Sequence, residues 1–322
     1  MKTVESASIK DATTTFVGVN HIGLSVKNLD KTLAFYQKAT NFELIVRKTI
    51  RNNPVADNLF ATANVEFEVA ILKSHQMLLE LTEFKHNANA EISDMPPQGP
   101  GMTHTCFQSS MSNSGFDKFV DADAKVLTRG NKPVDMGGYG VTYAYAYDPE
   151  GNMFEMEQLD PELMQKSGYA KNWGDGLKDV SMWMSQVALV THDIEQLMAF
   201  YQELMGYAPY RYAEISDRTV LDDIVNIDGV HLKGGWFKLD GDSKMLEIWE
   251  YLSPVTEQFK QKPNATDLGY TFSFEVGDLQ AEYQRLKAMN VEFFSEPVEF
   301  AGYLQVYARD ISGNVFALRQ VL

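Results

Sequence analysis

The sequence predicts an α+β fold in which four βαβββ modules pair into two tandem domains with cup-shaped mixed sheets. Two internal repeats support this prediction. The segment HIGLSVKNLDKTLAFYQ, which begins at His21, aligns without a gap on QVALVTHDIEQLMAFYQ, which begins at Gln186. The turn that begins at Asp148 returns in similar form at Asp310. Because 322 residues exceed what one core usually serves, we expect domains at residues 16–160 and 180–322.

The composition favours a small-molecule ligand. Hydrophobic residues make up 44% of the chain, which is ample for packed cores, and the formal net charge is -16. Nucleic acids and anionic membranes bind clusters of lysine and arginine, and the sequence contains no such cluster. We therefore expect neither nucleic acid nor membrane as a partner. The composition leaves the oligomeric state open.

The sequence favours a cytoplasmic location. No apolar run approaches the roughly eighteen residues of a membrane span, and residues 1–15 form a polar leader without a signal-peptide core. Cys106 is the only cysteine, so no intrachain disulfide can form, and this fits a reducing compartment.

The first module begins with an alternating strand that places His21 on its inward face. A helix follows, which Asn28 or Asp30 can cap and which Asn41 ends. Glu80 lies on the inward face of the last strand. The strands of this module are predicted at residues 17–26, 43–47, 65–72 and 76–83.

The second module repeats this order. His104 and Cys106 share one face of its first strand, and a helix is predicted at residues 116–128 with Gly130 as its C-cap. A strand at residues 143–147, a turn rich in Asp, Pro and Gly, and a returning strand then follow. Glu155 points inward from that returning strand, where a hydrophobic residue is expected.

A polar segment at residues 160–179 is predicted to connect the two halves. The third and fourth modules then repeat the pattern: residues 246–250 match residues 79–83, and residues 271–276 match residues 104–109. Asp278 is predicted to cap the last helix.

Equivalent inward positions in the four modules differ in chemistry. They are His21, Glu80, His104 and Glu155 in the first half, and Gln186, Glu247, Thr271 and Ala317 in the second. Burying two carboxylates without a counter-charge costs several kcal/mol for each, and we expect neither lysine nor arginine on these strand faces. A lone inward histidine is usually a satisfied core residue, but one His and one Glu recur in both modules. The first half is therefore predicted to bind one divalent ion (nickel, zinc, iron, cobalt or manganese) through His21, Glu80, His104 and Glu155.

The chain resembles the vicinal oxygen chelate superfamily, which includes glyoxalase I, extradiol dioxygenases and the bleomycin and fosfomycin resistance proteins. The segments that carry the resemblance are HIGLSVKNLDKTLAFYQ, LLELTEF, GMTHTCF, DPEGNMFEME, QVALVTHDIEQLMAFYQ and ARDISGNVFALRQ. The metal positions of the family fall on the four ligands named above, and their order is most similar to that of glyoxalase I. The resemblance implies a lyase or isomerase that acts through a metal-chelated enediolate on a small oxygenated substrate. Glu155 or Glu80 would be the catalytic base.

Two other functions stay open. A ring-cleaving or other oxygen-dependent dioxygenase would use iron or manganese on His21, His104 and Glu155, although a histidine that this group carries upstream of Tyr145 is missing. The other open function is that of a protein that binds or sequesters a small aromatic molecule between the domains. It is suggested by a cup in the second half that has few metal ligands and would be lined by Trp236, Trp249 and Tyr270.

Overall fold

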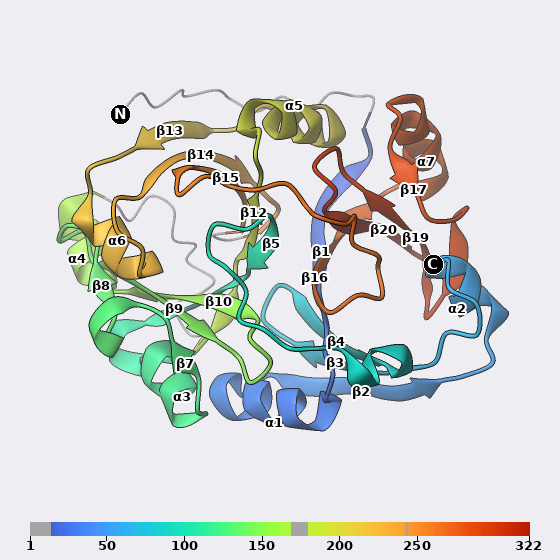
Figure 1. Ribbon diagram of the computed structural model, residues 1–322, viewed down its shortest axis with the longest axis horizontal. Helices are drawn as coiled ribbons and strands as arrows, with labels where there is room; N and C mark the ends of the chain where they lie inside the picture. The colour runs from blue at the N-terminus through green and yellow to red at the C-terminus, as the bar shows by residue number, and fades with distance from the viewer. Residues whose placement is uncertain (1–13, 169–179, 242–243) are drawn as a thin grey trace.

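The computed structural model describes residues 14–168, 180–241 and 244–322, and Figure 1 shows its arrangement. The fold is α+β with four βαβββ modules, as predicted. Most of the predicted leader and most of the predicted connection lie outside the described residues. The predicted domain limits, residues 16–160 and 180–322, stay a prediction.

The first module follows the sequence prediction closely. Asn28 caps its first helix by accepting from the Lys31 amide, and Asn41 ends that helix in the left-handed region at φ 58°. A second short helix, capped by Asn53, lies where the sequence suggested only a loop. The elements are β1 (Phe16–Ser25), α1 (Leu29–Thr40), β2 (Glu43–Ile50), α2 (Pro54–Leu59), β3 (Phe67–Lys73), β4 (Leu78–Phe84) and a 3-10 turn at Lys85–Asn89.

The second module has a shorter helix than predicted. The helix α3 ends after Asp121, because Asp123 takes the left-handed conformation at φ 70° and the chain turns into a strand. Gly130 lies in a separate 3-10 turn, so it is not the C-cap of that helix. The elements are β5 (Gly101–His104), β6 (Cys106–Ser110), α3 (Gly115–Asp121), β7 (Lys125–Val126), β8 (Val134–Asp135), β9 (Val141–Tyr147), β10 (Met153–Leu159) and α4 (Pro161–Ser167), with 3-10 turns at Met111–Asn113 and Arg129–Asn131.

The second half repeats the first. Asp193 and Asp278 cap its two long helices, the latter as predicted. The third module contains β11 (Trp183–Met184), β12 (Gln186–Val190), α5 (Ile194–Met205), β13 (Arg211–Ile215), α6 (Thr219–Val225), β14 (His231–Lys238) and β15 (Met245–Ser253). The fourth contains β16 (Gly269–Val276), α7 (Leu279–Ala288), β17 (Glu292–Phe293), β18 (Val298–Phe300), β19 (Tyr303–Arg309) and β20 (Val315–Val321).

The modules pair differently from the prediction. Strand β1 runs antiparallel to β16, so the first and fourth modules share one nine-stranded sheet, which we call the first cup. Strand β5 runs antiparallel to β12, and β6 pairs with β10, so the second and third modules form the second cup from a five-stranded and a six-stranded sheet. The expectation that the two modules of one half share a cup is wrong. Sequence periodicity defines each module but does not encode which module it pairs with.

The register within each module is the same, which confirms that the inward positions are equivalent. Each module has one inward residue on its first strand and one on its last strand. In every module the inward residue of the last strand pairs with a residue of the first strand, and that residue lies two positions after the inward one. The pairs are Glu80 with Gly23, Glu155 with Cys106, Glu247 with Ala188, and Ala317 with Ser273.

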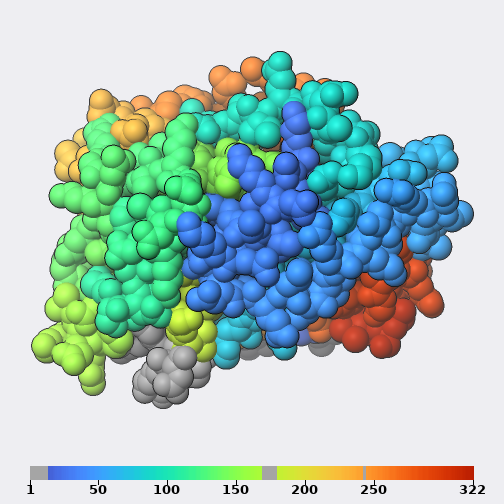
Figure 2. Space-filling view, turned by 90° about the horizontal axis from the view of Figure 1, so that it is seen from below, coloured from blue at the N-terminus to red at the C-terminus, as the bar shows by residue number. Residues whose placement is uncertain are grey.

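The long helices cover the outer faces of the sheets. Helices α1 and α3 contact each other on one side of the molecule, and α5 packs on β14 and β15 on the other. Figure 2 shows the first side, with the blue N-terminal segment between the green second module and the red C-terminal segment. A large apolar core lies between helices and sheets. The inner faces of the two cups are thereby left to hold either ligands or further packing.

Candidate metal centre

The predicted ligands separate into two pairs. His21 on β1 and Glu80 on β4 lie in the first cup, with 4.0 Å between Nε2 and Oε1. His104 on β5 and Glu155 on β10 lie in the second cup, with 3.9 Å between Nε2 and Oε2. Among the described residues, the one group of three or more such side chains close enough to share an ion contains neither His21 nor Glu80, so the prediction of one site that contains all four side chains is wrong.

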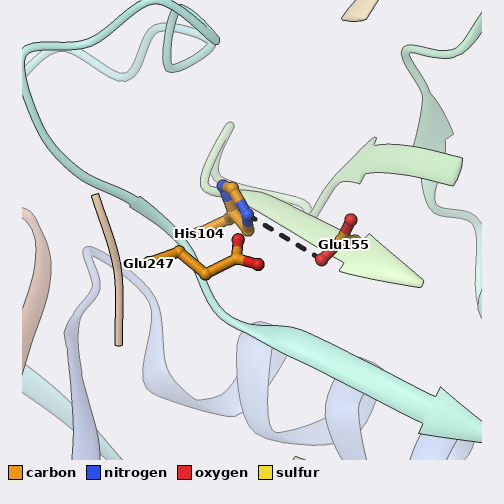
Figure 3. Close-up of side chains that lie close together, drawn as sticks. All are labelled: His104, Glu155 and Glu247. Atoms are coloured by element: carbon orange, nitrogen blue, oxygen red, sulfur yellow. Dashed lines mark ion pairs between the residues drawn. The ribbon is translucent and has the colours of Figure 1, made fainter. Parts of the chain in front are cut away.

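Glu247 of β15 completes the group in the second cup. One ligand atom each of His104, Glu155 and Glu247 lies within 4.8 Å of the other two, and Figure 3 shows the three side chains converging. Among the described residues, no other group of three His, Cys, Asp or Glu side chains lies this close. Gln186 is on the same face, because it is two residues from Ala188, the strand partner of both His104 and Glu247.

Three atoms of this group that could bind a metal have no hydrogen-bond partner. His104 Nε2, Glu155 Oε2 and Gln186 Oε1 are buried and have no hydrogen-bond partner. A buried polar atom without a partner costs about 1–3 kcal/mol, so three that line one cavity favour a bound ligand there. One imidazole, two carboxylates and an amide oxygen form a donor set that suits a divalent ion. The residues present therefore fit a bound metal.

Neighbouring side chains orient these donors. Thr103 Oγ1 lies 3.1 Å from His104 Nδ1, and a proton on Nδ1 leaves the Nε2 lone pair free for a ligand. The Tyr145 ring packs 4.9 Å from the imidazole. Glu247 accepts from the Trp236 indole at 2.8 Å and from the Trp249 indole at 3.3 Å. The two tryptophans fix Glu247, whereas Oε2 of Glu155 stays unbound.

Burial determines the charge state of the group. Burial lowers the pKa of His104 to about 3, so its imidazole is neutral as a metal ligand requires. Burial raises the pKa of Glu247 to about 7 and, with the nearby Glu247 and Glu157 charges, holds the pKa of Glu155 well above its ordinary value. Two ionised carboxylates at this depth need a nearby positive charge, which a divalent ion would provide.

The second cup contains a cavity of about 690 Å³, which borders the candidate metal-binding residues. His104, Glu155, Gln186 and Glu247 line one part of it. The remaining wall is largely aromatic and aliphatic, with residues of β9, β14, β15 and α6 among its members. This size and lining are typical of a small-molecule site.

The first cup is closed instead of open. Arg319 lies on β20 and its guanidinium is 3.4 Å from Glu80 Oε2, so the expectation that no cation faces these carboxylates is wrong. Phe60, at the end of α2, packs 5.4 Å from Phe67 and 5.3 Å from Tyr307, as measured between ring centroids. These rings belong to an apolar cluster that includes Ala317. Glu80 therefore has a cation of the protein itself as its partner.

Sequence reasoning missed Glu247 and Gln186 as site residues. Both had been aligned with the ligand positions of the first half, and Glu247 had the correct residue type. The eight inward residues alone could not reveal this, because the first and second modules together supply four strong ligands and so favour the wrong pair. The missing information is that the second module pairs with the third. Of the proposed aromatic wall, Trp236 and Trp249 line the cavity, whereas Tyr270 faces a different, smaller hollow.

Comparison with known proteins agrees with the fold. The family model described as "Glyoxalase/Bleomycin resistance protein/Dioxygenase superfamily" matches residues 18–156 and again residues 183–318. The chain belongs to this superfamily and contains two tandem copies of its domain. A search of curated proteins found no significant match.

Solved structures show the same architecture. Glyoxalase I from Zea mays is 17% identical, covers 94% of this chain and 92% of its own, and has a TM-score of 0.60. A proposed dioxygenase from Bacillus subtilis is 12% identical, covers 96% of this chain and 86% of its own, and also has a TM-score of 0.60. At these identities the likeness shows the fold alone. Within the described part of the chain, no helix combines the length and apolarity needed to cross a bilayer.

Proposed function

We propose that this protein is a metal-dependent enzyme of the glyoxalase type, a lyase or isomerase that acts on a small oxygenated substrate. The observation that carries the proposal is the set of unpartnered buried donors on His104, Glu155 and Gln186, beside Glu247, in the wall of a large cavity. A divalent ion held by these four residues would act as a Lewis acid on two adjacent substrate oxygens. Nickel, zinc, iron, cobalt and manganese all suit this donor set.

Glu155 is the proposed base. Its Oε2 has no partner, and burial raises its pKa, which makes the carboxylate a stronger base. Glu247 is less free to move because two indoles hold it. Glu155 would move a proton between neighbouring substrate carbons while the apolar wall keeps water out. Glu80, the other predicted base, lies in the first cup beside Arg319 and has no part in this proposal.

Oxygen-dependent ring cleavage is the weaker alternative. The triad suggested for it combined His21 with His104 and Glu155, and these side chains lie in two different cups. The second cup offers only one imidazole to its candidate ion. A protein that only binds or sequesters an aromatic molecule would use the same cavity, and for it the metal ligands would have no role.

Elemental analysis of protein purified without added metal tests the proposal. We expect close to one transition-metal ion per chain in the natural protein and a background amount in the His104→Ala variant. A substrate screen with and without oxygen then separates the reactions, because a lyase or isomerase consumes no oxygen. Background metal in the natural protein, also after incubation with the five candidate ions, would refute the enzyme and favour the binding protein.

A further inference from the structure

Two arginines in the second cup make no contact ion pair with a described carboxylate, although burial raises the pKa of Glu247 and the Arg211 charge, acting from a longer distance, lowers it. The chain carries a net charge of -16, so an arginine without a nearby carboxylate is unexpected. Six arginines in the described part of the chain lie within 4.0 Å of one, namely Arg47, Arg51, Arg129, Arg285, Arg309 and Arg319. Arg211 and Arg218 form no such pair with any described residue, and both line the cavity. Within the described part of the chain, both arginines without such an ion pair therefore lie at the proposed substrate site.

Arg211 is held in a defined position. It is opposite Trp236 on the neighbouring strand, and its guanidinium carbon lies 4.1 Å from the centroid of the Trp236 ring. The same indole donates to Glu247, so Arg211 flanks the wall that supports the candidate metal centre. Stacking on an aromatic face fixes the plane of the guanidinium. The Arg211 side chain therefore loses less conformational entropy when a ligand binds.

The hydrogen-bonding capacity of Arg211 is unused. Its Nε is buried and has no partner, and no hydrogen bond joins the guanidinium to any described residue. A buried charged donor without a partner is costly, and the planar fork of arginine matches an anion that presents two oxygens. A ligand that enters the cavity would supply those oxygens.

The rest of the cavity defines the body of that ligand. Tyr143, Tyr145, Trp183 and Trp249 contribute aromatic surface, and Leu221 and Ile224 of α6 contribute aliphatic surface. Aromatic walls of this kind bury flat apolar groups well. Arg218 and Lys238 are exposed cations that also line the cavity and would attract an anion during its approach.

We propose that Arg211 binds an anionic oxygen group, a carboxylate or a phosphate, on a small ligand with an aromatic or similarly apolar body. Only the statement that this ligand is the substrate rests on the proposed function. The selection of an aromatic anion by the cavity is independent of that function. Arg211 is a binding residue that selects the ligand and takes no part in proton transfer.

Calorimetric titration with naphthoate and its neutral amide, naphthamide, tests the selection. We expect the natural protein to bind naphthoate at least about tenfold more tightly than naphthamide, because a hydrogen bond to a charged group contributes about 1.5–3 kcal/mol. Arg211→Gln should remove that preference, and Arg51→Gln, which changes a surface arginine paired with Glu66, should keep it. Naphthyl phosphate, titrated in parallel, ranks the two anionic groups against each other.

A second variant tests the location. Phe60 closes the first cup, and Val225 is at the equivalent position of the second, where it lines the cavity. Val225→Phe should therefore abolish naphthoate binding while circular dichroism stays unchanged. Equal affinity for naphthoate and naphthamide, no binding of either, a preference that survives Arg211→Gln, or full binding in a folded Val225→Phe variant would overturn the proposal.

The same titration after metal chelation separates this proposal from the proposed function. If Arg211 holds the anion, the preference for naphthoate persists in chelator-treated protein. If an ion in the metal centre holds the anion instead, the preference disappears on chelation and the role of Arg211 is refuted. Failure of the enzyme proposal, shown by the absence of metal and turnover, leaves the naphthoate preference and its loss in Arg211→Gln intact.

Discussion

The two cups have the same strand register but use their inner faces differently. In the second cup, His104 and Glu155 meet Glu247, and several buried donors have no protein partner. In the first cup, Thr271 and Ala317 are at the positions of His104 and Glu155, and Arg319 pairs with the remaining carboxylate of Glu80. Among the described residues, the first cup thus pairs its carboxylate with an arginine at 3.4 Å, whereas no lysine or arginine lies within 4.0 Å of Glu155 or Glu247. His21 Nε2 of the first cup also has no hydrogen-bond partner, so the contrast concerns the carboxylates.

The two short helices that lie over the cups extend this difference. In α2, Asp57 accepts from the amides of Asn64 and Val65, and in α6 Asp222 accepts from Gly229 and Val230 in the same way. The segments are therefore equivalent in backbone. They differ in the side chain that follows: Phe60 fills the first cup, whereas the smaller Val225 leaves part of the second cup open. A cation and an aromatic ring thus accompany the replacement of two ligand residues in the first cup.

Exchanging residues between equivalent positions should produce the largest effect. Glu155→Ala introduces the residue that Ala317 provides in the first cup, and it removes both a ligand and the proposed base. We expect metal content to fall to background and turnover to fall at least about a hundredfold. Elemental analysis and steady-state kinetics measure the two quantities.

The control is the reciprocal exchange in the first cup. His21→Gln introduces the residue type of Gln186 and should leave metal content and turnover close to those of the natural protein. Unchanged metal in Glu155→Ala, or loss of metal in His21→Gln, would reverse the assignment of the two cups.

The ion pair of the first cup should contribute to the stability of the fold and not to metal binding. The Arg319 and Glu80 side chains are 7% and 14% exposed. Removing one partner of a buried pair leaves the other charge uncompensated, so Arg319→Met should lower the free energy of unfolding by about 3–5 kcal/mol. Urea unfolding measures this change, and metal content should be unaffected.

The double variant Arg319→Met with Glu80→Gln is the matched control. Because it removes both charges, most of the lost stability should return. A double variant that is no more stable than Arg319→Met alone would show that packing, and not the uncompensated Glu80 charge, causes the loss.

The sequence predicted each module well and their pairing poorly, for a physical reason. Alternation, caps such as Asn28 and Asp278, and the repeated turn are local signals, and they located the strands and helices. The contact of β1 with β16 joins residues about 250 positions apart. Because the four modules have similar first strands, the sequence does not show which of them pairs with β1. Half of the candidate site, His104 and Glu155, was therefore found, while Glu247 was aligned correctly but assigned to a cup without metal.

Acid stability should also report on His21, the buried imidazole of the first cup. Burial, with a smaller contribution from Arg319, lowers the pKa of His21 from 6.5 to about 3. Below pH 6.5 the unfolded chain therefore binds a proton that the folded chain does not, and stability falls as the pH is lowered. Two pH units below 6.5 the loss from this residue is on the order of 3 kcal/mol. Urea unfolding of His21→Gln over this pH range should show a correspondingly smaller loss. Identical pH profiles for the two proteins would mean that His21 titrates normally.

The smallest expected effect concerns the groups that orient the metal ligands. Trp236→Phe keeps most of the ring packing but removes the indole donor that holds Glu247 at 2.8 Å. Loss of such a supporting hydrogen bond typically costs 10–100-fold in metal affinity, and we expect about tenfold because the Trp249 indole still donates to the other carboxylate oxygen. Competition with a chromogenic chelator measures the change.

Tyr307→Phe is the control. It removes the hydroxyl bonded to Arg319 in the first cup and should leave metal affinity unchanged. If both variants weaken the metal equally, the cups are coupled through the shared core and cannot be treated as independent sites.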